Sequence, residues 1–126
     1  MPVRSNTAIS ILVLEDDDIC REVTRGVLQA AGFKVICARD FNEAICVVER
    51  GDQVDVALVD VHMPVGTPHG VSFARMAQQR RLELKVIFMS GSLSPFDLTI
   101  FDKDETVLQK PFTPAHLLEA VARAAA

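Results

Sequence analysis

The sequence predicts an α/β protein in which a five-stranded parallel sheet is covered by helices on both faces. Five short runs of apolar, β-branched residues recur along the chain, as expected for strands buried on both faces of a parallel sheet. The runs alternate with stretches of helical spacing, a β-α pattern that favours right-handed crossovers. The 126 residues contain no internal repeat or low-complexity linker, so we expect one domain over residues 9–126, after a flexible lead of residues 1–8.

The strands carry the clearest signal. The central run, Val56–Asp60, is apolar until it ends on a single carboxylate, and Pro64 follows four residues later. This composition is typical of a strand buried on both faces. The expected strands are Ile9–Leu14, Phe33–Ala38, Val56–Asp60, Lys85–Met89 and Val107–Gln109.

Two helices are expected before the central strand. The first covers Asp18 to Ala31, and Gly32 then provides a C-terminal stop. Its apolar positions at helical spacing are Ile19, Val23, Val27 and Ala30. The second begins with a capping box, in which Asp40 is the N-cap and Glu43 lies three residues later, and it runs to about Arg50.

The second half of the chain is less regular. A loop is expected over Pro64–Gly70, followed by a helix from about Val71 to Arg80. Residues 94–105 have the weakest pattern, and a short helix that Ser94-Pro95 opens and that runs through Phe101 is expected there. The closing helix begins at an N-cap threonine, Thr113, with proline at its first helical position.

Composition and charge narrow the possible functions. The net charge of −4 argues against nucleic acid as the main partner, because phosphate binding needs a basic face. No apolar run approaches the roughly 20 residues of a membrane span, and the N-terminus has no signal-peptide core, so we expect a cytoplasmic protein. The three cysteines show no metal-binding spacing and are expected to be small buried hydrophobic residues.

Polar side chains stand where the apolar strands end. The first strand runs into Glu15 and Asp16, the third ends on Asp60, and the fourth and fifth are followed by Ser90 and Lys110. The carboxyl ends of parallel strands share one edge of the sheet, where ligands bind in open α/β folds. Three carboxylates at that edge repel one another, and a hard divalent cation such as Mg²⁺ relieves the repulsion.

This set of groups suits phosphoryl transfer to a carboxylate. Asp60 would be the nucleophile, since aspartyl-phosphates are an established covalent strategy. Mg²⁺ held by Glu15, Asp16 and Asp60 would neutralise charge on the transferring group. The amine of Lys110 would bind one phosphate oxygen, and the Ser90 hydroxyl would donate to another.

At these residues the chain resembles the receiver domain of bacterial response regulators. The matching pieces are Ile11–Asp17, Val59–Pro64, Phe88–Gly91 and Leu108–Phe112. The resemblance implies a flavodoxin-like, doubly wound fold with strand order 2-1-3-4-5. It implies that Asp60 accepts a phosphoryl group from a histidine kinase or a histidine phosphotransfer protein, with Ser90 as the switch hydroxyl and Lys110 as the phosphate contact.

The resemblance also implies the metal ligands. Mg²⁺ would be held by Glu15, Asp16, Asp60 and the backbone carbonyl of His62. We expect a monomer or a weak dimer with no nucleic acid or membrane partner; the downstream protein target stays open.

Several positions depart from the family pattern. Val107 occupies the position of the usual switch aromatic, the loop Pro64–Gly70 is longer than the common form, and Lys103-Asp104 replaces the usual Gly-Ala. The fourth helix looks short. The long loop and the ending of Lys110 to Pro114 look most similar to receivers attached to hybrid histidine kinases.

Two other functions compete with the phosphoacceptor. A phosphatase of the haloacid-dehalogenase kind also uses a nucleophilic Asp after a strand, but it needs a second Asp where this chain has His62, and no cap domain fits in the chain. The second alternative is a receiver-like interaction module that works without phosphorylation. Val107 favours it mildly, but the complete set of predicted site residues speaks against it: Glu15, Asp16, Asp60, Ser90 and Lys110. A nucleotide or flavin binder is disfavoured, because no Gly-rich phosphate loop follows the first strand.

Overall fold

The computed structural model describes residues 8–62, 70–91, 101 and 105–126. Five strands form one parallel sheet in the order β2-β1-β3-β4-β5, which confirms the predicted topology. The strands are β1 Ser10–Leu14, β2 Lys34–Ala38, β3 Val56–Asp60, β4 Lys85–Ser90 and β5 Thr106–Gln109. The described helices are α1 Asp18–Ala30, α2 Phe41–Arg50, α3 Gly70–Arg80 and α5 Pro114–Ala125.

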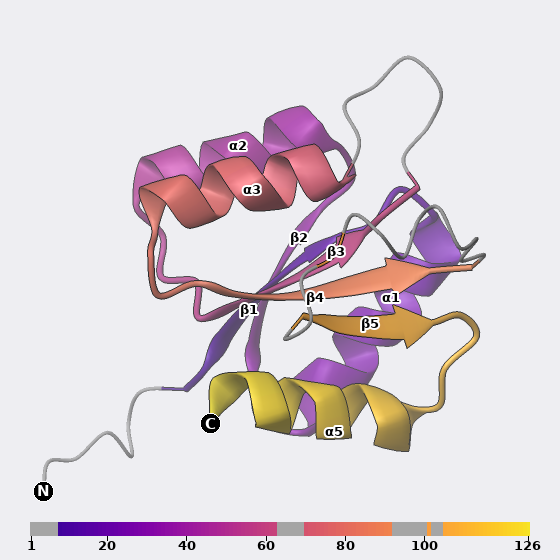
Figure 1. Cartoon of the computed structure of the whole chain (residues 1–126). Helices are drawn as coiled ribbons and strands as arrows, with labels where there is room; N and C mark the ends of the chain where they lie inside the picture. The colour runs from indigo at the N-terminus through magenta and orange to yellow at the C-terminus, as the bar shows by residue number, and fades with distance from the viewer. Residues whose placement is uncertain (1–7, 63–69, 92–100, 102–104) are drawn as a thin grey trace, which may run out of the picture.

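The helices cover both faces of the sheet (Figure 1). α2 and α3 lie on one face and α1 and α5 on the other, and each pair closes a separate apolar core. Alternate side chains of each strand feed the two cores, since successive strand residues point to opposite faces. The core under α2 and α3 includes Leu12, Leu14, Val59, Phe73 and Phe88. The core under α1 and α5 includes Ile11, Val13, Leu28, Leu58 and Val121.

The element ends follow the predicted local signals. The side chain of Asp40 accepts a hydrogen bond from the Glu43 N–H, 2.8 Å away, and so caps α2. Gly51 ends α2 with φ 83°, a left-handed conformation that glycine adopts without strain. Thr113 caps α5 by accepting from the His116 N–H at 3.1 Å. Most boundaries differ from the predicted ones by at most a single residue, as is usual for element ends.

The apolar positions expected on α1 do not all face the core. Ile19 and Val23 are 78% and 60% exposed, whereas α1 buries Arg21, Thr24 and Leu28. A charged residue can face the sheet here because the Arg21 guanidinium donates hydrogen bonds to the Glu15 carbonyl, just after β1, and to Asp18 at the start of α1.

The expectation of three buried cysteines is wrong. Cys20 and Cys37 are half-buried, and Cys46 is exposed. Cys46 belongs to α2, whose buried residues are Ala44, Val47 and Val48. Packing of α2 on the sheet uses those three positions, so the thiol is left in solvent.

Two predicted segments lie almost entirely outside the residues that the structure describes. The short helix expected from Pro95 lies outside the described residues, apart from its last residue, Phe101. The expected loop Pro64–Gly70 also lies outside them except for Gly70, which is the first residue of α3 rather than the end of the loop. Among the helices that the structure describes, none is long and apolar enough to cross a membrane.

Candidate functional site

Three carboxylates meet at the carboxyl edge of the sheet. Glu15 directly follows β1, Asp16 comes next, and Asp60 is the last residue of β3. One oxygen of each lies within 4.8 Å of the others. Glu15 and Asp60 are 1% and 5% exposed, while Asp16 is open to solvent. The cluster therefore has a buried base and a solvent-facing side.

Lys110 lies against the two buried carboxylates. Its Nζ donates to Glu15 Oε1 at 2.5 Å and lies 3.5 Å from Asp60 Oδ2. The Lys110 N–H donates to the Ser90 carbonyl at 2.7 Å, which continues the pairing of β4 with β5 beyond Gln109. This backbone contact brings the amine to the carboxylates across the sheet edge, although Lys110 is 95 residues from Glu15.

Backbone groups hold the remaining carboxylate oxygens. The Asp17 N–H donates to Glu15 Oε2 at 3.1 Å, and the His62 N–H donates to Asp60 Oδ1 at 3.1 Å. The Glu15 N–H donates to the carbonyl of Ala38 at the end of β2. Each buried carboxylate thus accepts a main-chain hydrogen bond from the turn that follows its own strand.

Ser90 is the last residue of β4 and is fully buried. Asp60 pairs in register with Met89, so Ser90 is one residue further along the neighbouring strand. The structure thus brings to one edge all five residues that the sequence predicts there. His62 is exposed and contributes its N–H to Asp60; the role of its carbonyl as a metal ligand stays a prediction.

The charges in the cluster shift the titration of its members. Burial, and then the neighbouring Glu15, raise the pKa of Asp60 to about 7. Burial alone would raise the pKa of Glu15, but hydrogen bonds, first among them the one from Lys110, outweigh it and the pKa is lowered. Burial likewise opposes the charged form of Lys110, yet Glu15 and Asp60 raise its pKa overall. Glu15 and Lys110 are thus charged at neutral pH, whereas Asp60 is close to its midpoint.

The donor atoms fit a hard divalent cation. All three carboxylates offer oxygen, the ligand type that Mg²⁺ prefers, and the exposed Asp16 leaves the cluster open to the waters that Mg²⁺ keeps. Burial first, and then Glu15, raise the pKa of Asp60, and the amine of Lys110 only partly opposes this rise. A second positive charge at this place would stabilise the ionised cluster.

Sequence reasoning missed Gly70. A Cβ added to this residue would lie 1.9 Å from the carbonyl oxygen of Asp60, so only glycine lets α3 begin this close to the end of β3. The Gly70 N–H also donates to the Val61 carbonyl at 3.3 Å. A lone glycine directly before a helical pattern was the available signal, but sequence alone does not reveal the contact with Asp60.

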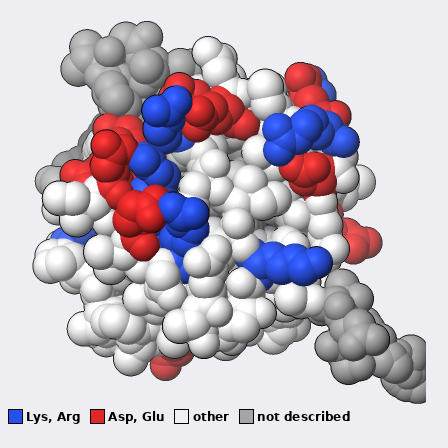
Figure 2. Space-filling model, turned by 180° about the vertical axis from the view of Figure 1, so that it is seen from behind, with Lys and Arg blue, Asp and Glu red and all other residues white. Residues whose placement is uncertain are grey.

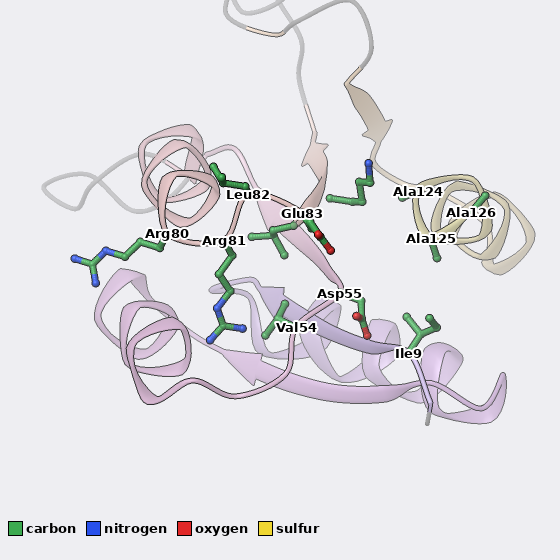
Figure 3. Close-up of a pocket in the computed structure, with 12 residues that line it drawn as sticks. Ile9, Val54, Asp55, Arg80, Arg81, Leu82, Glu83, Ala124, Ala125 and Ala126 are labelled. Carbon is green, nitrogen blue, oxygen red and sulfur yellow. The ribbon is translucent and has the colours of Figure 1, made fainter. Parts of the chain in front are cut away.

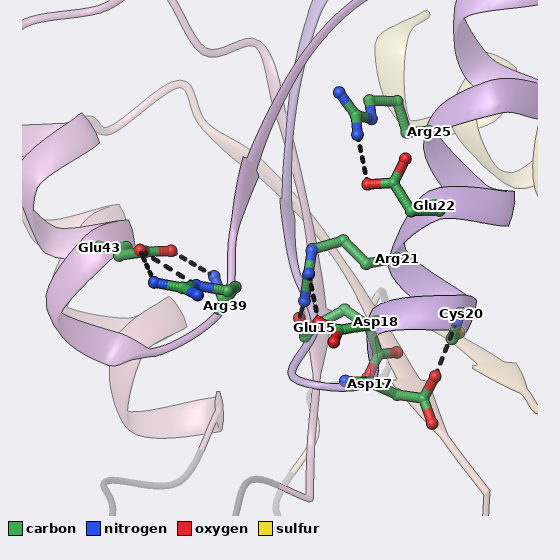
Figure 4. Close-up of polar contacts among 9 residues, drawn as sticks. All are labelled: Glu15, Asp17, Asp18, Cys20, Arg21, Glu22, Arg25, Arg39 and Glu43. Atoms are coloured by element: carbon green, nitrogen blue, oxygen red, sulfur yellow. Dashed lines mark hydrogen bonds and ion pairs between the residues drawn. The ribbon is translucent and has the colours of Figure 1, made fainter.

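Sequence reasoning also missed Arg21, which lies between the apolar positions expected on α1. The guanidinium of Arg21 points at the turn that holds Glu15 and Asp18 (Figure 4). Figure 4 also shows two other arginines, Arg25 and Arg39, each paired with a glutamate three or four residues away. A charged residue inside a helical pattern gives no local signal that it faces the sheet.

Charged residues of both signs mix on the face that Figure 2 shows. Basic and acidic side chains lie next to one another there, with no continuous basic patch in that view. Among the described residues, the ion pairs between near neighbours in the sequence include Arg21–Asp18, Arg25–Glu22, Arg39–Glu43 and Arg50–Asp52. That nucleic acid is not a partner stays a prediction, which rests on the net charge.

Two hollows differ in their relation to the carboxylates. One, of about 450 Å³, is lined by Lys110 of the cluster together with Cys20, Val23, Thr24, Pro111 and Phe112. Another, of about 630 Å³, is formed at the opposite edge of the sheet, between Ile9, Asp55, Leu82 and the end of α5 (Figure 3). It contains none of the residues predicted to act, so it is separate from the candidate site.

The sequence model of the response regulator receiver domain matches residues 11–122. This chain belongs to that family. A solved response regulator receiver protein from Sinorhizobium medicae has 27% sequence identity and a TM-score of 0.86, over 95% of this chain and 96% of the other. The response regulator TrrA from Thermotoga maritima, solved in complex with Mg²⁺-BeF, has 26% identity and a TM-score of 0.78, over 92% and 98%.

The curated relatives of the receiver domain are longer proteins. The transcriptional regulatory protein GltR from Pseudomonas aeruginosa is 31% identical over 120 residues, which is 89% of this chain and 47% of GltR. The chain spans less than half of the length of such curated relatives. Receiver domains accept phosphoryl groups from histidine kinases in two-component systems and bind Mg²⁺ at an acidic pocket. In this chain, the cluster of Glu15, Asp16 and Asp60 is an acidic group of this kind.

Proposed function

We propose that this receiver domain takes a phosphoryl group onto Asp60 from a histidine kinase or a histidine phosphotransfer protein. The observation that carries the proposal is the position of Asp60 at the carboxyl edge of the sheet, beside two carboxylates and within 3.5 Å of the Lys110 amine. A nucleophile next to a cation and a metal-binding set is the arrangement that phosphoryl transfer requires.

In the proposed transfer, Asp60 is the nucleophile, and Lys110 and Ser90 contact the phosphoryl oxygens. An oxygen of Asp60 attacks the phosphorus of the donor phosphohistidine, the P–O bond forms, and the P–N bond breaks with its electron pair left on the imidazole. Lys110, whose amine donates a hydrogen bond to Glu15 in the structure, carries the positive charge that a phosphoryl oxygen would attract. The Ser90 hydroxyl would donate to a second phosphoryl oxygen from the end of β4.

Glu15, Asp16 and Asp60 would hold Mg²⁺, with the His62 carbonyl as a further ligand. The ion would supply positive charge to the oxygens of the transferring group. TrrA, which has the same fold, was solved with Mg²⁺-BeF, and this supports the choice of cation. The protein's part is to keep three oxygens within 4.8 Å of one another at a partly open edge.

The surface around the cluster favours a protein as the phosphoryl donor. Ile19 and Val23 are exposed apolar residues one turn apart on α1, and Val23 also lines the hollow that reaches Lys110 and Phe112. Apolar surface next to a reactive group suits a partner that must bury its own surface to deliver the phosphoryl group. We expect the chain to meet this donor in the cytoplasm, as a monomer or a weak dimer.

Mass spectrometry of the intact protein tests the function. Wild type and Asp60→Asn are incubated with Mg²⁺ and phosphoramidate, a small phosphoryl donor that needs no docking surface. We expect wild type to gain one phosphoryl group only with Mg²⁺, and Asp60→Asn to gain none. Uptake by the variant at an unchanged rate would contradict Asp60 as the acceptor.

The same experiment distinguishes the phosphoacceptor from the interaction module. Val107 stands where the family has an aromatic residue, and it is half-buried opposite Phe88. Because valine has no ring, an aromatic rotamer coupled to Ser90 is not available at this position. If wild type binds Mg²⁺ but takes up no phosphoryl group from phosphoramidate or from a histidine kinase, a module that works without phosphorylation replaces the proposal.

A further inference from the structure

Arg21 is buried in a position where a charged residue needs specific partners. It lies near the start of α1, faces the sheet and is 9% exposed. Its Nη1 donates to the carbonyl oxygen of Glu15 at 3.0 Å, and its Nη2 donates to Asp18 Oδ1 at 2.5 Å (Figure 4). One planar guanidinium therefore joins the end of β1 to the start of α1.

The bond to Glu15 completes the main-chain pairing of that residue. The Glu15 N–H donates to Ala38 of β2 at 3.1 Å, and the Glu15 carbonyl accepts from Arg21. The carbonyl belongs to the peptide unit that links Glu15 to Asp16, the two carboxylates that share the cluster with Asp60. Its rotation would move both side chains, so its anchor affects the cluster directly.

Two other hydrogen bonds shape this turn from within. The Asp17 N–H donates to the Glu15 side chain, and Asp17 Oδ1 accepts from the Cys20 N–H at 2.8 Å as the N-cap of α1. Neither of them ties the Glu15 carbonyl to a packed side chain. Arg21 does so because its own side chain is buried between α1 and the sheet.

We propose that Arg21 is a positioning residue for the carboxylate cluster, acting through the peptide between Glu15 and Asp16. Groups that orient metal ligands commonly change metal affinity about 10–100-fold when they are removed. The inference rests on the proposed Mg²⁺ site, and it goes beyond that site by naming the residue that holds its geometry.

Charge and geometry predict opposite effects of removing Arg21. The guanidinium is a cation near the place of another cation, so a purely electrostatic role would make Mg²⁺ bind more tightly once Arg21 is neutralised. A positioning role would make Mg²⁺ bind more weakly. It would do so even in Arg21→Lys, which keeps the charge but lacks the planar pair of donors.

The experiment compares Arg21→Gln and Arg21→Lys with Arg25→Gln in the whole chain. Arg25 lies one turn further along α1 and pairs with Glu22 at the surface, away from the turn, so it is the matched control. Mg²⁺ affinity is measured by titration calorimetry. Amide hydrogen exchange at Asp16 and Asp17 is measured without Mg²⁺.

We expect both Arg21 variants to bind Mg²⁺ about tenfold more weakly and to exchange the Asp16 and Asp17 amides faster, with Arg25→Gln close to wild type. Unchanged exchange together with unchanged or tighter Mg²⁺ binding would overturn the proposal. If Arg21→Gln does not fold, Arg21→Lys decides. If wild type binds no Mg²⁺, the proposed metal site fails, and unchanged exchange in the metal-free variants would refute the positioning role separately.

Discussion

Because Gly70 has no side chain, α3 can begin directly beside the backbone of Asp60. It opens α3 beside the carbonyl of Asp60, where a Cβ would lie 1.9 Å from the oxygen and 3.0 Å from Val59 Cγ1. The obstacle at 1.9 Å is backbone at the end of a buried strand, so it cannot move aside as a flexible side chain would. The start of α3 and the acceptor residue are therefore coupled sterically.

We expect Gly70→Ala to lower the free energy of unfolding by about 1–3 kcal/mol, because α3 and β3 must move apart. Phosphoryl uptake at Asp60 should also slow. Chemical denaturation and uptake from phosphoramidate measure the two effects. Gly26→Ala is the control: a Cβ there meets nothing within 4 Å, and alanine favours the interior of α1. Equal stability of Gly70→Ala and wild type would contradict the steric coupling.

The surroundings of Asp60 determine its pKa, and through the pKa its affinity for a cation. Burial and Glu15 raise its pKa to about 7, so a proton competes with a cation for the carboxylate near neutral pH. We expect Mg²⁺ affinity to fall as the pH is lowered below 7, by on the order of tenfold per pH unit where one proton is displaced. Titration calorimetry over a series of pH values on both sides of this pKa would show it, and an affinity independent of pH would contradict the raised pKa.

At the scale of elements, α3 is joined to the start of β5 across β4. The Arg75 guanidinium lies 5.7 Å from the ring centroid of Phe88 and pairs with both carboxylate oxygens of Glu105, with one contact at 2.8 Å. The Phe101 ring packs on Phe88 with centroids 4.8 Å apart. The Glu105 side chain is 11% exposed, so its charge is largely removed from water.

We expect Glu105→Gln to lower the free energy of unfolding by about 1–3 kcal/mol, because the largely buried ion pair of Arg75 with Glu105 loses its negative charge. The matched pair is Arg80–Glu49, which joins α3 to α2 with both side chains half exposed. Glu49→Gln should change the stability by less than about 1 kcal/mol. Denaturant unfolding of both variants tests this, and equal losses would show that burial does not distinguish the two pairs.

At the scale of the whole molecule, the candidate site costs stability when no cation is bound. The pKa of Asp60 is raised from 3.8 to about 7 in the folded state, so the folded chain binds this proton more tightly than the unfolded chain. The resulting stabilisation is complete below about pH 3.8 and is lost as the pH rises through about 7. The lowered pKa of Glu15 acts in the opposite sense, but only at acidic pH.

We expect Asp60→Asn without Mg²⁺ to gain stability relative to wild type as the pH rises from 3.8 to about 7, and the gain to level off above that pH, since the amide carries no charge to be buried beside Glu15. Added Mg²⁺ should raise the unfolding temperature of wild type more than that of the variant, because the cation binds the folded cluster. Thermal unfolding with EDTA and with Mg²⁺ at each pH provides the measurement. A constant difference between the two proteins across pH would be evidence against the raised pKa.

The order of elements and the composition of the site follow from local sequence. The β-branched runs mark the strands, and their polar ends identify Glu15, Asp16, Asp60, Ser90 and Lys110. This works because the carboxyl ends of parallel strands must share an edge, whatever the details of packing. Capping residues such as Asp40 and Thr113 are equally local, since they bond to amides within three residues.

The tertiary structure decided what depends on contacts between distant segments. The sequence of α1 offers two faces, one with Ile19 and Val23 and one with Arg21 and Leu28, and only packing against the sheet selects the second. The contact of Gly70 with Asp60 and the pairing of Arg75 with Glu105 likewise join residues that local patterns do not relate. The raised pKa of Asp60 arises from burial and from Glu15, which follows another strand, so it exists only once the sheet is assembled.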